Sequence, residues 1–174
     1  TMFKTIGVEP TALVNGNVPM DLDVTPFDNS KTIKEGVSRT YKGFDGYAPM
    51  MAYIGAEGYL ANTELREGKQ HSQKGTPAFL RQTLSIAHQL TEKPLLVRMD
   101  SGNDAAVNLG ILIEDGSWFV IKRNLRKAEK KEEWLAKVQG CCKDIRHPRD
   151  GKTVYVGSSW KDVSYKTTGG EEKS

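Results

Sequence analysis

Alternating apolar and polar residues predict several strands in the first half of the chain. One strand is expected over 18–25, and two more are expected over 47–54 and 59–66, on either side of the turn Gly55-Ala56-Glu57-Gly58. Strands that are joined by a short glycine-containing turn form a β-hairpin. The segment 31–46 is polar and interrupted by glycine, so it predicts a loop or an irregular edge.

Apolar residues then recur at helical spacing. Thr76-Pro77 predicts a helix start with Thr76 as the N-cap and Pro77 in the first position. The rest of the pattern predicts, in chain order, a buried strand, a helix, a strand with Trp118 in the core, a charged helix and two short strands: 95–100, 103–115, 118–121, 127–138, 153–156 and 163–165. This order indicates an α/β fold with an antiparallel hairpin beside parallel strands joined by crossover helices.

Composition narrows the class of protein. The 174 residues are 37% hydrophobic and 27% charged, which is typical of one soluble domain with a real core. No apolar run approaches the roughly 20 residues of a membrane span, and Thr1-Met2-Phe3-Lys4 does not begin a signal peptide. Cys141 and Cys142 are adjacent, which suits neither a disulfide nor a zinc site. A cytoplasmic protein is therefore expected.

Positive charge is concentrated in two segments although the net charge is only +3. Residues 122–131 carry six cations and one acid, and 31–42 carries Lys31, Lys34, Arg39 and Lys42 against Glu35. Such runs form either a solvated face or a surface for phosphate groups.

Carboxylates stand at the ends of two predicted strands. Asp21 and Asp23 alternate with apolar residues, so they share one face of the first strand. Asp100 directly follows five mostly apolar residues, at the end of the buried strand that is predicted over 95–100. Ligand sites of open α/β sheets gather at such carboxyl ends. If these strands are neighbours, Asp23 and Asp100 face each other and can share a magnesium ion that acts on a phosphodiester. The alternatives are a turn residue before Pro26 for Asp23 and a helix cap for Asp100.

Four phrases occur in an order that resembles a known family. They are Asp21-Leu22-Asp23-Val24-Thr25, Tyr41-Lys42-Gly43-Phe44-Asp45-Gly46-Tyr47-Ala48-Pro49, Leu65-Arg66-Glu67-Gly68-Lys69-Gln70-His71 and Val97-Arg98-Met99-Asp100-Ser101-Gly102-Asn103. Together they resemble the DDE-type transposases of bacterial insertion sequences, in particular the group numbered thirteen-eighty. The resemblance covers roughly residues 18–140.

The resemblance implies an RNase H-like (retroviral-integrase-like) fold, a mixed sheet flanked by helices. It implies cleavage of double-stranded DNA at transposon ends and joining to target DNA, with two Mg²⁺ or Mn²⁺ ions held by Asp, Asp and Glu. The first aspartate matches Asp23, with Thr25 completing its phrase and Asp21 as second choice, and the second matches Asp100. Phosphate contacts are expected from Lys42 and from the basic residues of the second cluster: Lys122, Arg123, Arg126 and Lys127.

The third family carboxylate, a glutamate in a Y-x2-R-x3-E-x6-K phrase, has no counterpart. Neither Tyr155 nor Tyr165 is followed by arginine three residues later. The expected organisation is an irregular lead-in over 1–17, an incomplete catalytic core over 18–140, and the start of a β-rich insertion with a frayed tail over 141–174. The chain is accordingly expected to be a truncated piece that is inactive alone.

Three functional hypotheses follow from these features. The first is a transposase core fragment from a bacterial, nucleoid-associated protein that acts as a homodimer when complete. The second is a non-catalytic DNA-binding module with a vestigial acidic site. The third is a small RNase H-like nuclease in which another acid replaces the missing one: Glu64, Asp45 or Asp104.

Overall fold

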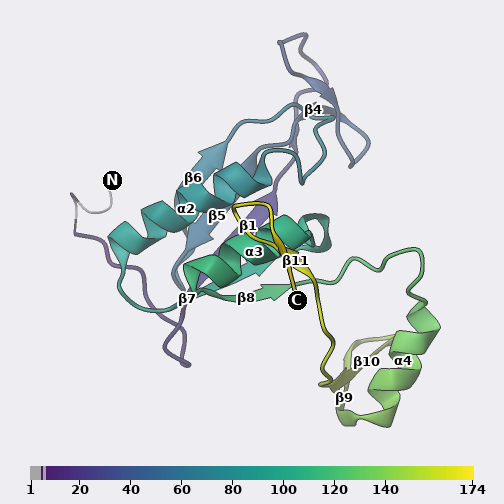
Figure 1. Ribbon diagram of the computed structural model, residues 1–174. Helices are drawn as coiled ribbons and strands as arrows, with labels where there is room; N and C mark the ends of the chain where they lie inside the picture. The colour runs from purple at the N-terminus through teal and green to yellow at the C-terminus, as the bar shows by residue number, and fades with distance from the viewer. Residues whose placement is uncertain (1–4, 6) are drawn as a thin grey trace. The chain divides into compact units, whose positions relative to one another are not determined.

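The chain forms two compact units in the computed structural model, which describes residue 5 and residues 7–174 (Figure 1). The first unit comprises the chain up to Arg123 together with Ser164–Lys173, and the second comprises Asn124–Val163 with Ser174. A division after residue 140 is predicted from the sequence. In the two units, the helix before residue 140 is grouped with a strand that follows it.

A five-stranded mixed sheet forms the centre of the first unit. Its order is β6-β5-β1-β7-β8, in which β7 is parallel to both β1 and β8, and β5 is antiparallel to both β1 and β6. The strands are β1 (Val18–Val24), β5 (Met50–Ile54), β6 (Tyr59–Glu64), β7 (Leu95–Met99) and β8 (Trp118–Ile121). The predicted hairpin and the predicted parallel strands are therefore present.

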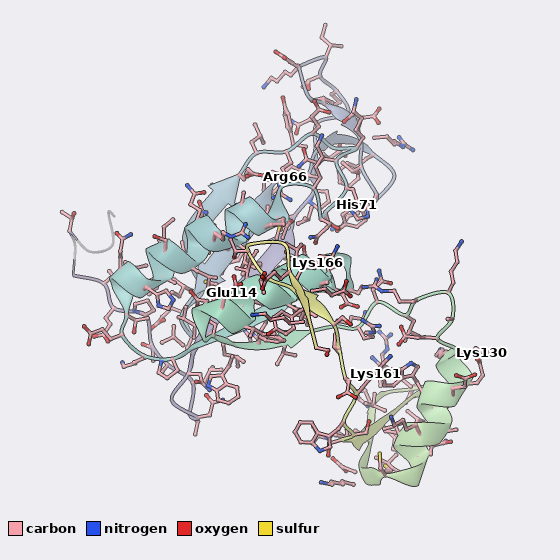
Figure 2. The ribbon with its side chains drawn as sticks, viewed as in Figure 1. Arg66, His71, Glu114, Lys130, Lys161 and Lys166 are labelled. Atoms are coloured by element: carbon pink, nitrogen blue, oxygen red, sulfur yellow. The ribbon has the colours of Figure 1, made fainter. Side chains whose placement is uncertain are left out.

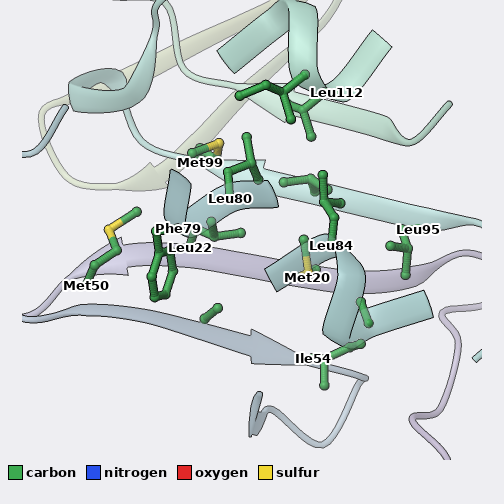
Figure 3. Close-up of a cluster of buried hydrophobic side chains, with 14 of the residues drawn as sticks. Met20, Leu22, Met50, Ile54, Phe79, Leu80, Leu84, Leu95, Met99 and Leu112 are labelled. Carbon is green, nitrogen blue, oxygen red and sulfur yellow. The ribbon is translucent and has the colours of Figure 1, made fainter. Parts of the chain in front are cut away.

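The core lies between one face of this sheet and two helices, α2 (Thr76–Leu90) and α3 (Ala106–Asp115). Every second residue of β1, starting at Val18, is buried, as alternation requires of a strand with one covered face. Figure 3 shows Leu80, Leu84 and Leu112 reaching from the helices towards Met20 and Leu22. This packing fixes which side chains of each strand point away from the helices.

Both helices begin differently from their predicted starts. Gly75, at φ 81°, is the N-cap of α2, whereas Thr76 is buried and its hydroxyl donates to the carbonyl of Ser72 at 2.6 Å. The helix predicted over 103–115 begins at Ala106, and a separate 3₁₀ turn, Ser101–Asn103, precedes it. The Asp100 side chain accepts from Gly102 N and caps this 3₁₀ turn.

The segment predicted as a loop over 31–46 contains part of a small antiparallel sheet, β2-β4-β3. Its strands are β2 (Phe27–Asp28), β3 (Ser38–Arg39) and β4 (Asp45–Tyr47). Strands this short leave no periodic signal in the sequence. A Cβ at Gly46 would lie 1.9 Å from the Phe27 carbonyl oxygen, so glycine is required where β2 and β4 meet.

The prediction that Trp118 is a core residue was wrong, because its side chain is 65% exposed. Trp118 pairs with Leu96, which lies on the sheet face that the helices do not cover. Leu60 and Val120 are also large exposed side chains of this sheet.

The C-terminal segment, expected to be frayed, forms a hairpin of β11 (Tyr165–Lys166) and β12 (Glu172–Lys173) that packs on α3. A Cβ at Gly110 would lie 1.7 Å from the carbonyl oxygen of Lys166, so only glycine allows this approach. The Thr168 backbone N–H donates to both carboxylate oxygens of Glu114, at 3.0 and 3.1 Å. These contacts hold a polar segment that has no apolar pattern of its own.

The second unit contains α4 (Lys131–Gly140), β9 (Cys142–Arg149) and β10 (Lys152–Gly157). The strand β9 was not predicted because nearly all its residues are polar and exposed. Lys161 lies over the Trp134 ring at 5.3 Å and pairs with Glu129 at 2.6 Å. Within the part of the chain that the structure describes, no helix is long and apolar enough to cross a membrane.

Candidate metal centre

The two acids singled out by the sequence lie next to each other at the carboxyl ends of neighbouring strands. β1 and β7 are parallel and their last paired residues are Leu22 and Met99, so Asp23 and Asp100 are the next residues in register. Neighbouring strands are about 4.8 Å apart. Because Leu22 and Met99 point into the core, both aspartates are directed to the opposite face, where both are exposed.

Each aspartate has one carboxylate oxygen held by its own local backbone. Asp23 Oδ1 accepts from the Val24 N–H at 2.8 Å. Asp100 Oδ1 accepts from the Gly102 N–H at 3.0 Å and from Asn103 Nδ2 at 2.9 Å. The second oxygen of each carboxylate has no hydrogen-bond donor within residues 7–174. Two oriented carboxylate oxygens without protein donors are a donor set that fits a hard divalent cation.

Ionisation of Asp23 is disfavoured at this position, and its pKa is raised. Desolvation by the surrounding atoms is the main cause that raises this pKa above its ordinary value of 3.8, and the negative charges of Asp100 and Asp21 add to it. The Val24 N–H and the nearby Lys42 act in the opposite direction. A bound cation would offset the repulsion.

Asp23→Asn is expected to raise the thermal stability of the metal-free protein at neutral pH. The pKa of Asp23 is higher in the folded than in the unfolded chain, so its ionised form destabilises the fold at pH above that raised pKa. This penalty disappears as the pH falls below the unfolded value. Melting curves in a chelator should show a higher Tm for the variant at pH 7 and a difference that closes near about pH 4. A lower Tm for the variant at pH 7 would contradict the conclusion that the ionised Asp23 side chain destabilises the fold.

Asp21, the second choice for the first ligand, is engaged elsewhere. Its two carboxylate oxygens accept from Nε and Nη2 of Arg98, each at 2.5 Å. Arg98 is its direct neighbour in the register of β1 and β7. The bidentate pair therefore leaves Asp23 as the aspartate of β1 that is open to a cation.

A cavity of about 540 Å³ lies over the two carboxylates. Acidic, basic and aromatic side chains line it together: Asp23, Arg39, Tyr41, Lys69, His71 and Asp100. Basic side chains and a pair of acids in one cavity suit a ligand that is itself anionic and that reaches the acids through a divalent ion, such as a phosphodiester.

Arg66 anchors the loop that carries the basic side of this cavity. Its side chain is only 2% exposed, pairs with Glu64 at 2.5 Å, and donates to the Ser72 carbonyl at 3.0 Å. Arg66 and His71 both lie on the segment between β6 and α2 (Figure 2). Arg66 was not predicted as a site residue, since a single arginine in a polar segment gives no signal of burial.

Asn103 was also missed. It is fully buried, and its side-chain Nδ2 donates to Asp100 Oδ1 at 2.9 Å, which orients the carboxylate. The side chain of Asn108, which is buried as well, donates to the Asn103 carbonyl at 2.9 Å and to Gln73 Oε1 at 2.9 Å. In addition, Ser72 Oγ donates to the Gly102 carbonyl at 3.3 Å. These hydrogen bonds connect the turn after Asp100 to the loop before α2.

The expected DNA-binding residues are distributed over both units. Lys42 lies close enough to influence Asp23, and the backbone of Lys122 donates to the Met99 carbonyl at 3.1 Å, beside the end of β7. Arg123 pairs with Asp104 at 3.0 Å. Arg126 and Lys127 belong to the second unit.

The acids considered as substitutes for the missing third ligand all have basic partners. Glu64 pairs with Arg66, Asp45 with Arg39 at 3.6 Å, and Asp104 with Arg123. Among residue 5 and residues 7–174, no group of three or more His, Cys, Asp or Glu side chains is placed to hold a metal ion. The candidate centre therefore consists of two carboxylates.

No protein-family model matches the chain, and no curated protein matches its sequence. Among solved structures, the chain is similar to a piggyBac transposase in a synaptic complex with hairpin DNA, with a TM-score of 0.43 and 12% sequence identity. The match covers 88% of this chain and 31% of that one, so this chain spans about a third of the length of that protein. A likeness at this level establishes neither a common fold nor a common function.

Proposed function

We propose that the chain is part of the catalytic core of a DDE-type DNA transposase with an RNase H-like fold. In this proposal Asp23 and Asp100 hold Mg²⁺ or Mn²⁺ for cleavage and transfer of DNA strands. The observation that carries it is the placement of the two carboxylates at adjacent strand ends, each with one oxygen anchored and one open. The resemblance of the phrases around Asp23, Tyr41, Arg66 and Asp100 to insertion-sequence transposases supports the same conclusion.

The sheet also supports the proposal. An antiparallel hairpin, β5-β6, lies on one side of β1, and the parallel strands β7 and β8 lie on the other. The sequence pattern predicted an antiparallel hairpin beside parallel strands, and this arrangement places the two motif aspartates at the carboxyl ends of neighbouring strands.

In this mechanism the protein orients the reacting groups. Asp23 and Asp100 would present their open oxygens to the cation, and Lys69, Arg39 and His71, which line the same cavity, would contact the DNA backbone. A bound divalent ion supplies activation of the attacking oxygen and stabilisation of the leaving oxygen. Lys42 and Lys122 add sequence-independent phosphate contacts, whose contribution weakens as salt concentration rises.

A non-catalytic DNA-binding module is the second candidate, and the lack of a third carboxylate at the described site favours it. Calorimetric titration of Mn²⁺ into the chain distinguishes the two. Saturable binding that disappears in the double variant Asp23→Asn, Asp100→Asn supports the transposase core. No binding to the wild-type chain, or binding that the double variant retains, contradicts it.

Asn103→Ala is expected to weaken Mn²⁺ binding by about 10- to 100-fold, the usual effect of removing a group that orients a metal ligand. The substitution removes a donor to Asp100 Oδ1 and frees the carboxylate to rotate. Unchanged affinity in Asn103→Ala, with the fold intact by circular dichroism, would show that Asn103 does not position the carboxylate.

A further inference from the structure

We propose that Tyr41 forms a subsite that stacks on an unpaired DNA base next to the phosphate held at Asp23 and Asp100. This inference rests on the proposed function and specifies the form of DNA that the site takes. The observation behind it is the position of an exposed aromatic ring in the wall of the cavity that contains both carboxylates.

The ring is presented to solvent by a tight turn. Tyr41 lies at the tip of the connection between β3 and β4, which is closed by Thr40 N to the Phe44 carbonyl at 2.8 Å and by Gly43 N to the Thr40 carbonyl at 3.0 Å. Gly43 has φ 87°, a conformation that favours glycine and fixes the turn. Tyr41 itself is 72% exposed, so its ring is not part of the protein core.

The ring is also close to the acids. The charges of both Asp23 and Asp100 raise the pKa of the Tyr41 hydroxyl, after desolvation as the main cause. A phosphate at the two carboxylates would therefore place its own nucleotide within the neighbourhood of the ring. The adjacent Lys42, whose charge acts on Asp23, is suited to the phosphate of that nucleotide.

The strands on either side of this turn, β3 and β4, are held by contacts with the loop at Gly68 and Lys69. The Lys69 N–H donates to Ser38 Oγ at 3.0 Å, beside β3. A Cβ at Gly68 would lie 2.1 Å from the Ser38 carbonyl oxygen and 2.3 Å from the Gly46 carbonyl oxygen, so the loop passes in direct contact with β3 and β4. A ring on such a support loses little freedom when it stacks, which favours binding.

The chemistry of stacking decides which DNA fits. Every base has a π-face, so an exposed tyrosine can stack on any base without sequence preference. In an intact duplex these faces are covered by neighbouring base pairs. An unpaired base at a strand end can turn both faces towards Tyr41, whereas the last pair of a blunt duplex exposes one face and its bases are held by pairing. The subsite therefore takes DNA with unpaired nucleotides in preference to blunt, fully paired DNA.

The test compares two fluorescein-labelled duplexes that differ only in a short unpaired overhang, with binding to the chain measured by fluorescence anisotropy in Mn²⁺. The wild-type chain is expected to bind the overhang duplex roughly tenfold tighter than the blunt one, the effect of one stacked base. Tyr41→Ala should lose this preference, and Tyr41→Phe, which keeps the ring, should retain it. Ile33→Ala is the matched control, because Ile33 lies in the connection between β2 and β3, is fully exposed and does not line the cavity.

Each other outcome has a definite meaning. A preference that survives in Tyr41→Ala overturns the subsite, and so does a loss in Tyr41→Phe as large as in Tyr41→Ala, since the hydroxyl rather than the ring would then be responsible. Equal binding of both duplexes by the wild-type chain overturns the subsite and leaves the proposed function standing. Binding to neither duplex contradicts DNA binding by this chain, and the inference fails with it.

Discussion

Asp23→Asn and Asp100→Asn are each expected to abolish Mn²⁺ binding, whereas Asp21→Asn should leave it intact. Asparagine keeps the size of aspartate and can still accept the backbone hydrogen bonds at Oδ1. It removes the negative charge that a divalent cation needs. With only two carboxylates in the centre, the loss of one should lower the affinity more than about 100-fold, beyond the usual effect of a residue that merely orients a ligand.

The control at Asp21 makes this prediction specific. Asp21 carries the same charge on the same face of β1, two residues before Asp23, but Arg98 occupies both of its carboxylate oxygens. Titration calorimetry of all three variants separates a true ligand from a general effect of negative charge. Equal weakening by all three would mean that Mn²⁺ is attracted to the acidic face without a defined site. Loss in Asp21→Asn alone would reverse the assignment of the first ligand.

Arg66→Met is expected to destabilise the first unit by about 2–4 kcal/mol. It is also expected to loosen the loop from which Lys69 and His71 line the cavity. Methionine retains the apolar stem beside Phe79, over whose ring the guanidinium lies at 5.8 Å. It removes the donors to the Ser72 carbonyl, to Thr76 Oγ1 and to Glu64. Breaking a buried pair costs about 3–5 kcal/mol, and the estimate is lower here because Glu64 is 41% exposed and regains water.

Urea denaturation monitored by circular dichroism measures this loss. Arg81→Met is the matched control, since Arg81 is an exposed arginine of α2 and should change the unfolding free energy by less than about 0.5 kcal/mol. Arg66→Lys should fall between wild type and Arg66→Met, because lysine keeps the charge but cannot reach all three acceptors at once. Equal stability of Arg66→Met and wild type would show that the loop is held by its other contacts, such as Gly68.

The sequence predicted the central sheet well because its strands combine alternation with apolar runs. The hairpin of β5 and β6 and the strands β1 and β7 all followed from that pattern. Trp118 failed because an aromatic residue in a strand signals a sheet but not which of its faces is covered. The small sheet of β2, β3 and β4 and the hairpin at 165–173 were not predicted for another reason. Tertiary contacts hold them, and their sequences carry no periodic pattern.

Some residues of the candidate site could likewise be predicted from the sequence, and others could not. The two aspartates stood out because charged residues at strand ends are conspicuous in an apolar context. Arg66 and Asn103 did not, because their importance depends on burial and on partners distant in sequence. The ion pair of Asp21 could not be predicted from the sequence, since the guanidinium that engages Asp21 comes from Arg98 of β7.

The division of the chain into units has a consequence for its biosynthesis. The first unit is completed by Ser164–Lys173, which follow the whole of Asn124–Val163 on the ribosome. At typical translation rates, those intervening residues take roughly 2–8 s to emerge. Until the hairpin of β11 and β12 emerges, nothing from that hairpin covers the face of α3 at Gly110. Folding of the first unit is thus expected to finish only after Ser164–Lys173 have left the exit tunnel.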